Sequence, residues 1–372
     1  MALVWIGLSL LLYSLSTECL RYPTDKDSAR KLFRGWQNEH RKHYRTREQE
    51  VYGFEVFHEN LKKINELNDL HRSRTEYRIN KFADMSVSEF KSKILMPPRK
   101  PPQRGTKTCL GSKVTDPLPQ SFDWTDKGVV TSVKDQGTVG TCWAFSTIGN
   151  IEGQWAIMGK PLTNLSVELL VDCDGTQDVK DGEADCGVFG GWPFLAFQFI
   201  QKLGGLETWE DYGYCSGSGK CFPCAPPGYN KTLCGPPESY CLKNQSCAAK
   251  LNRTKFITGL EVVSWEQVDK NETIMADQLM KLGPLSIALN AALLQFYHSG
   301  IFDPPICDPQ DLDHAVLLVG FGQEKSVFGT RDFWKVKNSW GHKWGEEGYF
   351  RIKRGVGKCG MNTQVVNAFL KQ

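Results

Sequence analysis

Apolar positions in the front part of the chain recur at helical spacing. Leu32, Phe33 and Trp36 lie on one side of a first predicted helix. A longer amphipathic helix follows, because its apolar residues are three and four positions apart. These residues are Val51, Phe54, Phe57, Leu61 and Ile64. The next stretch, EYRINKF, alternates like a short strand. The front therefore predicts a small, mainly helical unit.

A proline-rich segment separates this unit from the rest of the chain. Ser86 and Glu89 first form a capping box that begins a third helix. The sequence MPPRKPPQRGTK at 96–107 then contains too much proline for a helix or a central strand. We expect it to be an exposed, cleavable linker. It divides the cysteine-free front from a cysteine-rich back.

The back part, from Leu118, changes its pattern along the chain. Helical spacing is found around 142–158 and 192–204, and a cysteine-rich insert occupies 215–250. Strand-like runs come later, in PLSIALNA, HAVLLVGFG, DFWKVKNSW and YFRIKRG. Helices first and strands afterwards predict an α+β fold with two subdomains.

The N-terminal segment, MALVWIGLSLLLYSLSTECL, is apolar and then becomes small and polar. It is shorter than the about 20 apolar residues that span a bilayer, so residues 1–19 predict a secretory signal peptide. A buried N-terminal helix or strand is the alternative. No later segment has the length of a membrane helix, and we expect no membrane span.

Charge and modification motifs change the picture only slightly. The net charge of +3 over 372 residues gives no case for a nucleic-acid partner. Glycosylation sequons and clustered cysteines both favour the secretory pathway, as a lysosomal, endosomal or extracellular protein. The sequons begin at Asn164, Asn230, Asn244, Asn252 and Asn271.

The cysteine count points to a free thiol. The chain has 13 cysteines, and removal of Cys19 and Cys109 with the front leaves 11, an odd number. Cys142 is the best candidate for the unpaired one, because Gly137 and Gly140 precede it and a helical pattern follows. A helix N-terminus stabilises a thiolate, which is the nucleophilic form. The alternative is a buried, inert thiol.

A thiolate nucleophile needs a base, and the back part contains only His298, His314 and His342. His314 is favoured because it begins an apolar strand that would hold it rigidly. Asn338 ends the next strand run and could orient the imidazole if the strands are neighbours. A surface or core histidine is the alternative interpretation for each.

These residues resemble the papain-like cysteine peptidases of the cathepsin L and cathepsin F types. The resemblance rests on Val139-Gly-Thr-Cys142-Trp143 and on the blocks LDHAVLLVGFG and VKNSWGHKWGEEGYFRI. It implies a papain-like fold with a helical left subdomain and a β-barrel-like right subdomain. It further implies an inhibitory propeptide at 20–117 and a peptidase domain at 118–372.

The resemblance also implies roles for particular residues. Cys142 would be the nucleophile, His314 its proton partner, and Asn338 the residue that holds the imidazole. Trp340 would shield that hydrogen bond, and Gln136 would form the oxyanion hole. The resting enzyme would hold a thiolate–imidazolium pair. No metal or other cofactor is expected.

The same resemblance implies a substrate groove with a mostly apolar pocket. We expect Leu, Val or Phe at the second residue before the cut, whereas a plain core turn at GGWPF is the alternative. The expected groove residues are Gly190, Gly191, Trp192, Pro193, Ala288, Leu312, Ala315 and Gln364.

In the front segment, Phe57, Asn60, Ile64 and Asn68 match the family's propeptide helix, and Asn80, Phe82 and Asp84 match its second motif. Gln49, Gly53 and Arg78 depart from the family pattern, which puts the usual helix salt bridge in doubt. Protonation of carboxylates such as Asp84 is expected to weaken the grip of the propeptide at acid pH.

The disulfide pattern also departs from the family. Val139 stands where a cysteine is usual, so Cys186 is expected to reach into the insert instead. The resemblance implies the pairs Cys307–Cys359 and Cys173–Cys221. Alternatives for the insert are a redox or zinc site at CFPC and a cathepsin B-like occluding loop, but it contains no histidine.

The function expected is that of a monomeric cysteine endopeptidase made as a zymogen, with protein and peptide substrates and its own propeptide as an intramolecular partner. The alternative functions are a catalytically silent binding protein on the same scaffold and a free-standing protease inhibitor formed by the front segment.

Overall fold

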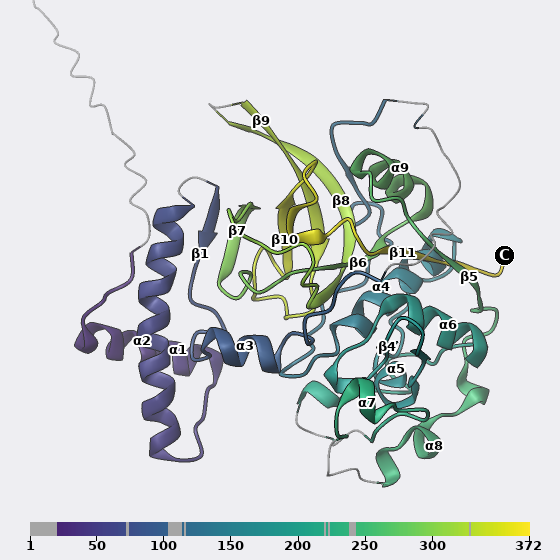
Figure 1. The fold of residues 1–372 in the computed structure, drawn as a ribbon, viewed down its shortest axis with the longest axis horizontal. Helices are drawn as coiled ribbons and strands as arrows, with labels where there is room; N and C mark the ends of the chain where they lie inside the picture. Colours follow the sequence, from purple (N-terminus) through teal and green to yellow (C-terminus); the bar gives the residue numbers. More distant parts are fainter. Residues whose placement is uncertain are drawn as a thin grey trace, which may run out of the picture.

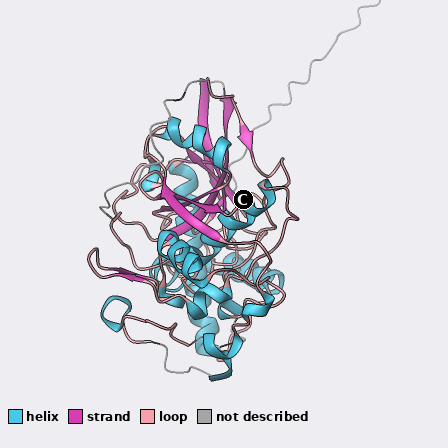
Figure 2. Ribbon diagram, turned by 90° about the vertical axis from the view of Figure 1, so that its right-hand side faces the viewer, coloured by secondary structure: helices cyan, strands magenta, loops and turns pink. Residues whose placement is uncertain are grey.

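The structure is a computed structural model that describes residues 21–71, 74–102, 114, 117–218, 221, 224–237, 243–326 and 329–372. Two helices stand at one end, a curved sheet occupies the centre, and a helical lobe lies below it (Figure 1). From the side, most strands lie in the upper half and most helices in the lower half (Figure 2). The expected signal peptide, Cys109 and positions 103–107 lie outside the described residues.

The helical front forms as the sequence predicts. Its elements are α1 (Lys26–His40), α2 (Arg47–Leu70), β1 (Thr75–Tyr77) and α3 (Val87–Lys93). Aromatic rings from α1 and α2, among them Phe33 and Phe54, form a separate small core. The predicted capping box of Ser86 and Glu89 is present at α3. The strand is shorter than expected and ends at Tyr77, with a bulge between Glu76 and Tyr77.

The unusual residues of the pro-helix have a structural consequence. A Cβ atom on Gly53 would lie 2.7 Å from the hydroxyl of Tyr44, so only glycine leaves room for that ring. Tyr44 donates a hydrogen bond to Asp84, which also pairs with Lys42 at 2.8 Å. Asp84 therefore stabilises the propeptide internally. The expected weakening of the front segment's grip at acid pH stays a prediction.

The helical lobe surrounds one almost fully buried helix. α4 (Cys142–Ile157) has buried residues on all sides, as expected for a helix in a core. It packs against α6 (Pro193–Leu203), which begins with proline at its first turn. Among the described residues, no helix is long and apolar enough to cross a membrane. The smaller elements of this lobe are α5 (Glu168–Cys173), β3 (Gln177–Asp178), β4 (Glu183–Ala184), α7 (Lys231–Cys234) and α8 (Cys247–Lys250). Short 3-10 turns occur at Gly187–Phe189, Ser216–Ser218, Lys243–Gln245 and Arg253–Lys255.

The later part of the chain forms one large mixed sheet. Its order is β1-β7-β10-β9-β8-β6-β11-β5, with β2 paired to β8. All four predicted strand runs are confirmed as β6, β8, β9 and β10. The ends of the described sheet, β1 and β5, are not paired with each other, so the expected barrel-like subdomain is an open, curved sheet. The bounds are β2 (Phe122–Asp123), β5 (Val262–Gln267), α9 (Glu272–Leu282), β6 (Leu285–Leu289), β7 (Tyr297–Phe302), β8 (His314–Ser326), β9 (Gly329–Lys337), β10 (Tyr349–Lys353) and β11 (Val365–Leu370), with a 3-10 turn at Lys358–Gly360.

The front segment attaches to the back part of the chain by extending this sheet. β1 pairs antiparallel with β7, and Thr75 lies opposite Gly300. Gly300 has φ +89, and a Cβ atom there would lie 2.3 Å from the carbonyl oxygen of Arg74. Glycine is thus required for the close approach of the two segments.

The expected exposed linker is wrong at Met96 and Arg99. Met96 is buried, and Arg99 forms a two-way backbone bridge with Leu312. Pro97 and Pro98 are exposed, as their composition suggested. A proline-rich chain needs no internal hydrogen bonds, so it can lie extended in a groove and bind through its neighbours.

The disulfides confirm two expectations and overturn one. Cys307 pairs with Cys359, and Cys186 reaches the insert through a bond to Cys234. The expected pair Cys173–Cys221 is wrong: Cys173 is bonded to Cys247, and Cys221 to Cys215. The physical reason is that α5 packs against α8, which brings Cys247 to the end of α5. Cys224 is also in a disulfide, whereas Cys241 lies outside the described residues.

Candidate active site

The free thiol begins the buried helix α4. Cys142 is the only free cysteine among the described residues, and it is fully buried. Its Sγ accepts a hydrogen bond from the backbone N–H of Ala315 at 3.4 Å. Residue 315 follows His314 at the start of β8, so the fold brings this sulfur beside the predicted base.

His314 begins β8, and Asn338 directly follows the adjacent antiparallel strand β9. β8 pairs with β9, and His314 Nε2 lies 2.8 Å from Asn338 Oδ1. That oxygen also accepts the N–H of Ser339, which identifies it as the carbonyl side of the amide. Nε2 must therefore carry the proton in this bond. His314 Nδ1 has no hydrogen-bond partner among the described residues, and it is the nitrogen left for proton exchange.

Trp340 covers this hydrogen-bonded pair. Its ring stacks on the imidazole of His314 with the centroids 4.7 Å apart, and it is fully buried. Phe82 and Phe90 of the front segment meet the same indole edge-on, at 5.6 and 5.3 Å. The front segment thus contacts the tryptophan that touches the histidine.

Gln136 faces the same site with a fixed amide. Ser339 Oγ donates to Gln136 Oε1 at 2.7 Å, which turns Nε2 the other way. Nε2 donates to the carbonyls of Ile94 and Val139, both at 2.8 Å. The propeptide carbonyl of Ile94 therefore occupies the donor that was predicted to bind an oxyanion.

Burial favours the neutral forms of both reactive groups in this state. It raises the pKa of Cys142 to about 12, and the Asp313 carboxylate acts in the same direction. It lowers the pKa of His314 to about 4, against the hydrogen bond of Asn338. The expected thiolate–imidazolium pair is thus disfavoured while the front segment covers the site.

Two of the expected groove residues, Gly190 and Gly191, contact Met96. The sulfur of Met96 lies 3.4 Å from the N–H of Gly191, and a Cβ atom on Gly190 would meet Met96 at 3.0 Å. The Met96 side chain belongs to one apolar cluster with Trp192, Ala288, Leu312 and Ala315. Pro193 is buried at the start of α6, and the carbonyl of Gln364 accepts the N–H of Ala288.

Several residues of the site were not predicted from the sequence. Asp313 precedes His314, and burial raises its pKa to about 7 although Ala291 donates a backbone hydrogen bond to it. Ser339 orients Gln136, and Met96 fills the groove. The position of Asp313 beside the histidine could have marked it. The other two depend on tertiary contacts.

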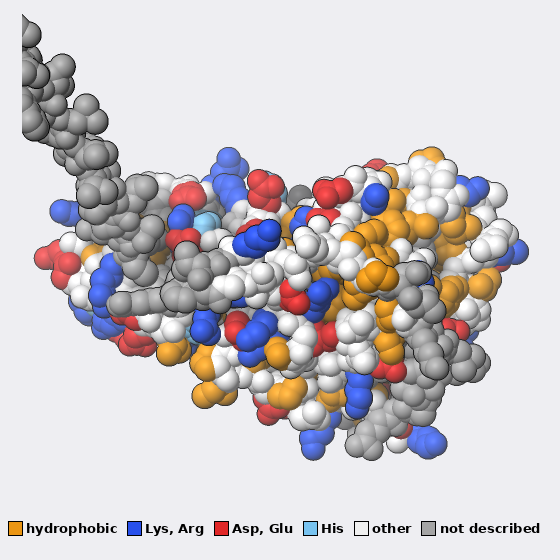
Figure 3. Space-filling model, turned by 90° about the horizontal axis from the view of Figure 1, so that it is seen from above, with side chains coloured by type: hydrophobic (Ala, Val, Ile, Leu, Met, Phe, Trp, Pro, Cys, Tyr) orange, Lys and Arg blue, Asp and Glu red, His pale blue; other side chains and the backbone are white. Residues whose placement is uncertain are grey.

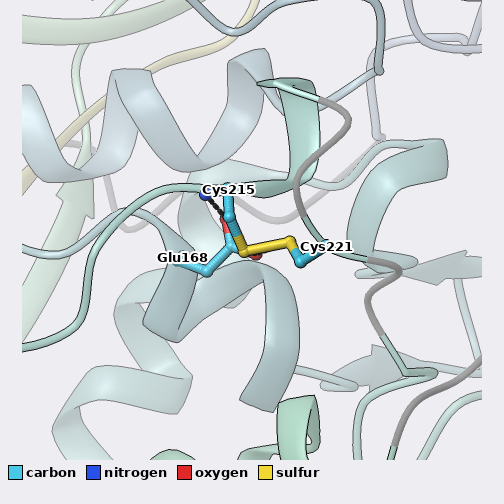
Figure 4. Close-up of side chains that lie close together, drawn as sticks. All are labelled: Glu168, Cys215 and Cys221. Carbon is cyan, nitrogen blue, oxygen red and sulfur yellow. Dashed lines mark hydrogen bonds between the residues drawn. A yellow bond between two sulfur atoms is a disulfide. The ribbon is translucent and has the colours of Figure 1, made fainter.

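A cluster that resembles a metal site lies outside the groove. Glu168, Cys215 and Cys221 are close together, but the two sulfurs are bonded to each other and offer no thiolate (Figure 4). Glu168 instead accepts hydrogen bonds from the N–H groups of Cys215 and Ser216. The carboxylate therefore ties the insert to α5.

The asparagines of the predicted glycosylation sequons differ in exposure. Asn244, Asn252 and Asn271 are exposed, whereas Asn164 and Asn230 are half-buried. Three of the sequon asparagines also cap helical turns with their side chains: Asn230, Asn252 and Asn271. Seen from above, acidic and basic side chains are intermixed on the visible face, without a field of one sign (Figure 3).

Known proteins show the same combination of parts. Residues 118–369 match the family described as papain family cysteine protease, and residues 33–90 match the cathepsin propeptide inhibitor domain (I29). The chain therefore belongs to the papain family of cysteine peptidases, in a form that carries its propeptide.

Individual relatives resemble the chain over most of its length. Cathepsin F of Mus musculus is 35% identical over 339 residues, which cover 91% of this chain and 64% of the mouse protein. Cysteine proteinase 1 of Dictyostelium discoideum is 36% identical over 346 residues, which cover 91% of this chain and 92% of the Dictyostelium protein. Among solved structures, the digestive procathepsin L 3 of Tenebrio molitor has a TM-score of 0.72 at 29% identity, with 92% and 99% coverage.

Proposed function

We propose that the chain, once freed of its propeptide, cleaves peptide bonds as an endopeptidase through Cys142 and His314. The observation that carries this proposal is one arrangement: the Cys142 sulfur accepts the N–H of the residue after His314, Asn338 holds His314 Nε2, and Gln136 Nε2 donates to the carbonyl of Ile94. These are a nucleophile, an oriented base and a donor for developing negative charge.

The chemistry follows from these positions. His314 Nδ1 takes the thiol proton, and the thiolate attacks the carbonyl carbon of the scissile peptide bond. Gln136 Nε2 and the backbone N–H of Cys142 then stabilise the oxyanion. The imidazolium protonates the leaving amine as the C–N bond breaks, which leaves a thioester. Water, deprotonated by His314, attacks the thioester, and the acid and the thiolate are released.

Met96 supports an apolar preference at the second residue before the cut. It is a buried apolar side chain that contacts Gly190 and Gly191 and belongs to the same hydrophobic cluster as Ala288, Leu312 and Ala315. Leu, Val or Phe would fill the same space after the propeptide leaves. A peptide library that favours Arg or an acidic residue at this position would contradict the preference.

The propeptide supports latency by occupying each part of the groove. Ile94 uses the Gln136 donor, Met96 fills the apolar pocket, and Phe82 with Phe90 covers Trp340. The insert offers no histidine that could hold a substrate C-terminus, which favours internal cleavage over removal of terminal dipeptides. We further propose maturation in the secretory pathway, on the basis of the N-terminal segment and the disulfides.

Two matched histidine variants test the proposal. Acid-treated proenzyme should cleave a quenched peptide with Leu at the second position, and iodoacetamide should abolish the activity. Cys142→Ser and His314→Gln should each lose about 10³-fold or more in kcat. His342→Gln, which changes an exposed histidine, should keep the parent rate. A parent protein that neither cleaves peptides nor reacts with a covalent peptide probe would instead be a silent binding protein.

A further inference from the structure

A buried carboxylate beside the groove holds a cation from the propeptide. Glu183, on β4, is only 8% exposed. Its Oε2 accepts hydrogen bonds from the indole N–H of Trp192 and from the guanidinium of Arg99, the latter at 3.3 Å. Arg99 also donates to the carbonyl oxygen of Ala184 at 3.0 Å. The peptidase domain thus provides two acceptors for one guanidinium.

These acceptors face a pocket of about 340 Å³ next to the groove. Arg99 enters it directly beyond Met96, and Pro97 and Lys100 line it from the propeptide side. The walls that belong to the peptidase domain are Gly182, Glu183, Ala184, Cys186, Phe189, Leu233 and Cys234. Because Pro97 and Arg99 follow Met96 closely in the chain, the pocket lies next to the position that Met96 occupies.

The cysteine-rich insert forms the outer wall of this pocket. Leu233 and Cys234 lie in α7, and the bond between Cys234 and Cys186 attaches that helix beside Ala184. The unusual Cys186–Cys234 bond therefore holds one part of the insert in place beside the groove.

We propose that Glu183, the Ala184 carbonyl and this wall form a subsite that binds a basic side chain, preferably arginine, at the third or fourth residue before the cut. The inference rests on the proposed peptidase function and names a further specificity determinant for it. Arg99 occupies the subsite in the zymogen and leaves with the propeptide.

The surroundings of Glu183 favour a cation there. Asp185 Oδ1 accepts the N–H of Trp192, and Asp185 interacts with the buried carboxyl of Asp174. Burial and Asp174 raise the pKa of Asp185, whereas the charge of Arg99 lowers it. Loss of Arg99 removes a positive charge from the carboxyls of Glu183 and Asp185, and a substrate guanidinium would restore it. The planar guanidinium of arginine has a fork of N–H donors, which fits a carboxylate plus a carbonyl better than the ammonium of lysine does.

The test compares peptides that differ at one position. Mature enzyme would be assayed with quenched peptides that carry Leu at the second position before the cut, and Arg, Lys or norleucine at the third or the fourth. We expect kcat/KM to be about 10-fold or more higher for Arg than for norleucine at one of these positions, the range of a charge-assisted hydrogen bond. In Glu183→Gln, which keeps an acceptor for Trp192, that ratio should fall to within about 3-fold.

Asp181→Asn is the matched control, because it removes an exposed negative charge two residues away. It should keep the parent ratio. If Glu183→Gln fails to fold, Arg99→Gln in the proenzyme provides a second test, because it leaves the peptidase domain unchanged. Without the guanidinium bound to Glu183, the propeptide should be held less tightly and acid processing should be faster.

The outcomes separate the two proposals. If the parent cleaves none of the peptides, the peptidase function fails. If it cleaves them without a preference for Arg at either position, the subsite is wrong. The same holds if Glu183→Gln keeps the preference or if Asp181→Asn loses it equally.

Discussion

The carboxyl groups with shifted pKa values in the propeptide have lowered values, whereas several buried carboxyl groups of the peptidase domain have raised values. In the propeptide, hydrogen bonds from Ser28 lower the pKa of Asp25, and Lys62 lowers that of Glu59. Burial alone would raise the pKa of Glu89, but the hydrogen bonds of Ser86 and Lys93 lower it. In the peptidase domain, burial raises the pKa of Asp174 to about 6 and that of Asp313 to about 7.

This difference gives the two regions opposite responses to acid. A lowered carboxyl pKa contributes stability above the ordinary value, and the contribution is lost as pH falls through the folded pKa. A raised carboxyl pKa contributes stability below the ordinary value, and the contribution is lost as pH rises through the folded pKa. Asp211 and Asp303 of the peptidase domain have lowered pKa values and moderate the contrast. Acidification should therefore weaken the propeptide more than the enzyme that it covers.

The largest expected effect comes from the aromatic contact between the two regions. Phe82→Ala removes a buried ring that meets Phe90 and Trp340. The loss should cost about 3–5 kcal/mol in propeptide folding and binding. The proenzyme should become active at neutral pH, measured as peptide cleavage without acid treatment. Val51→Ala, at a half-exposed position of α2, should remain latent. Equal latency of both variants would show that the aromatic contact is unimportant.

The pH response of the peptidase domain can be examined at Asp313. Because its pKa is raised to about 7, the parent should lose stability as pH rises from about 4 to 7. Asp313→Asn keeps an acceptor for Ala291 and cannot ionise. In the inactive Cys142→Ser background, it should be more stable at pH 7 by roughly 2–4 kcal/mol and unchanged at pH 4. Urea unfolding at both pH values measures this, and an equal gain at both would refute the assignment.

A smaller effect is expected at the edge where β1 joins β7. Gly300→Ala places a Cβ atom against Arg74 of the propeptide and also strains a backbone with φ +89. Gly355→Ala is the matched control, because its φ is +94 but its Cβ position is open. Both should destabilise the mature enzyme by a similar amount, about 1–3 kcal/mol. Only Gly300→Ala should speed acid processing. If the two variants process at the same rate, the strand pairing does not contribute to latency.

The sequence predicted what local rules decide. The capping box of Ser86 and Glu89, the helix at Cys142 and the strands that carry His314 and Asn338 all follow from spacing and from neighbouring residues. These features need no knowledge of distant contacts, so pattern and helix chemistry were sufficient.

Features set by tertiary packing were not predictable. The prolines beside Met96 indicated an exposed chain, but a groove formed by residues almost 100 to 220 positions later binds the methionine. The pairing of Cys173 depends on how α8 packs on α5. The described sheet stays open because β1 and β5 do not pair with each other, which no strand pattern specifies.

The smallest expected effect concerns a buried histidine of the propeptide. His71 ends α2 and meets the ring of Tyr77 edge-on at 5.5 Å. Burial lowers its pKa below 6.5, Asp303 of the peptidase domain opposes the shift, and Arg74 adds to it. The neutral ring therefore contributes stability above pH 6.5 that is lost as pH falls below that value. His71→Gln removes this loss, so the midpoint pH of processing should fall by a few tenths of a unit. His43→Gln, at an exposed position of the same propeptide, should leave the midpoint unchanged. A midpoint that moves equally in both variants, or upward in His71→Gln, would show that acid acts on the propeptide through its carboxylates alone.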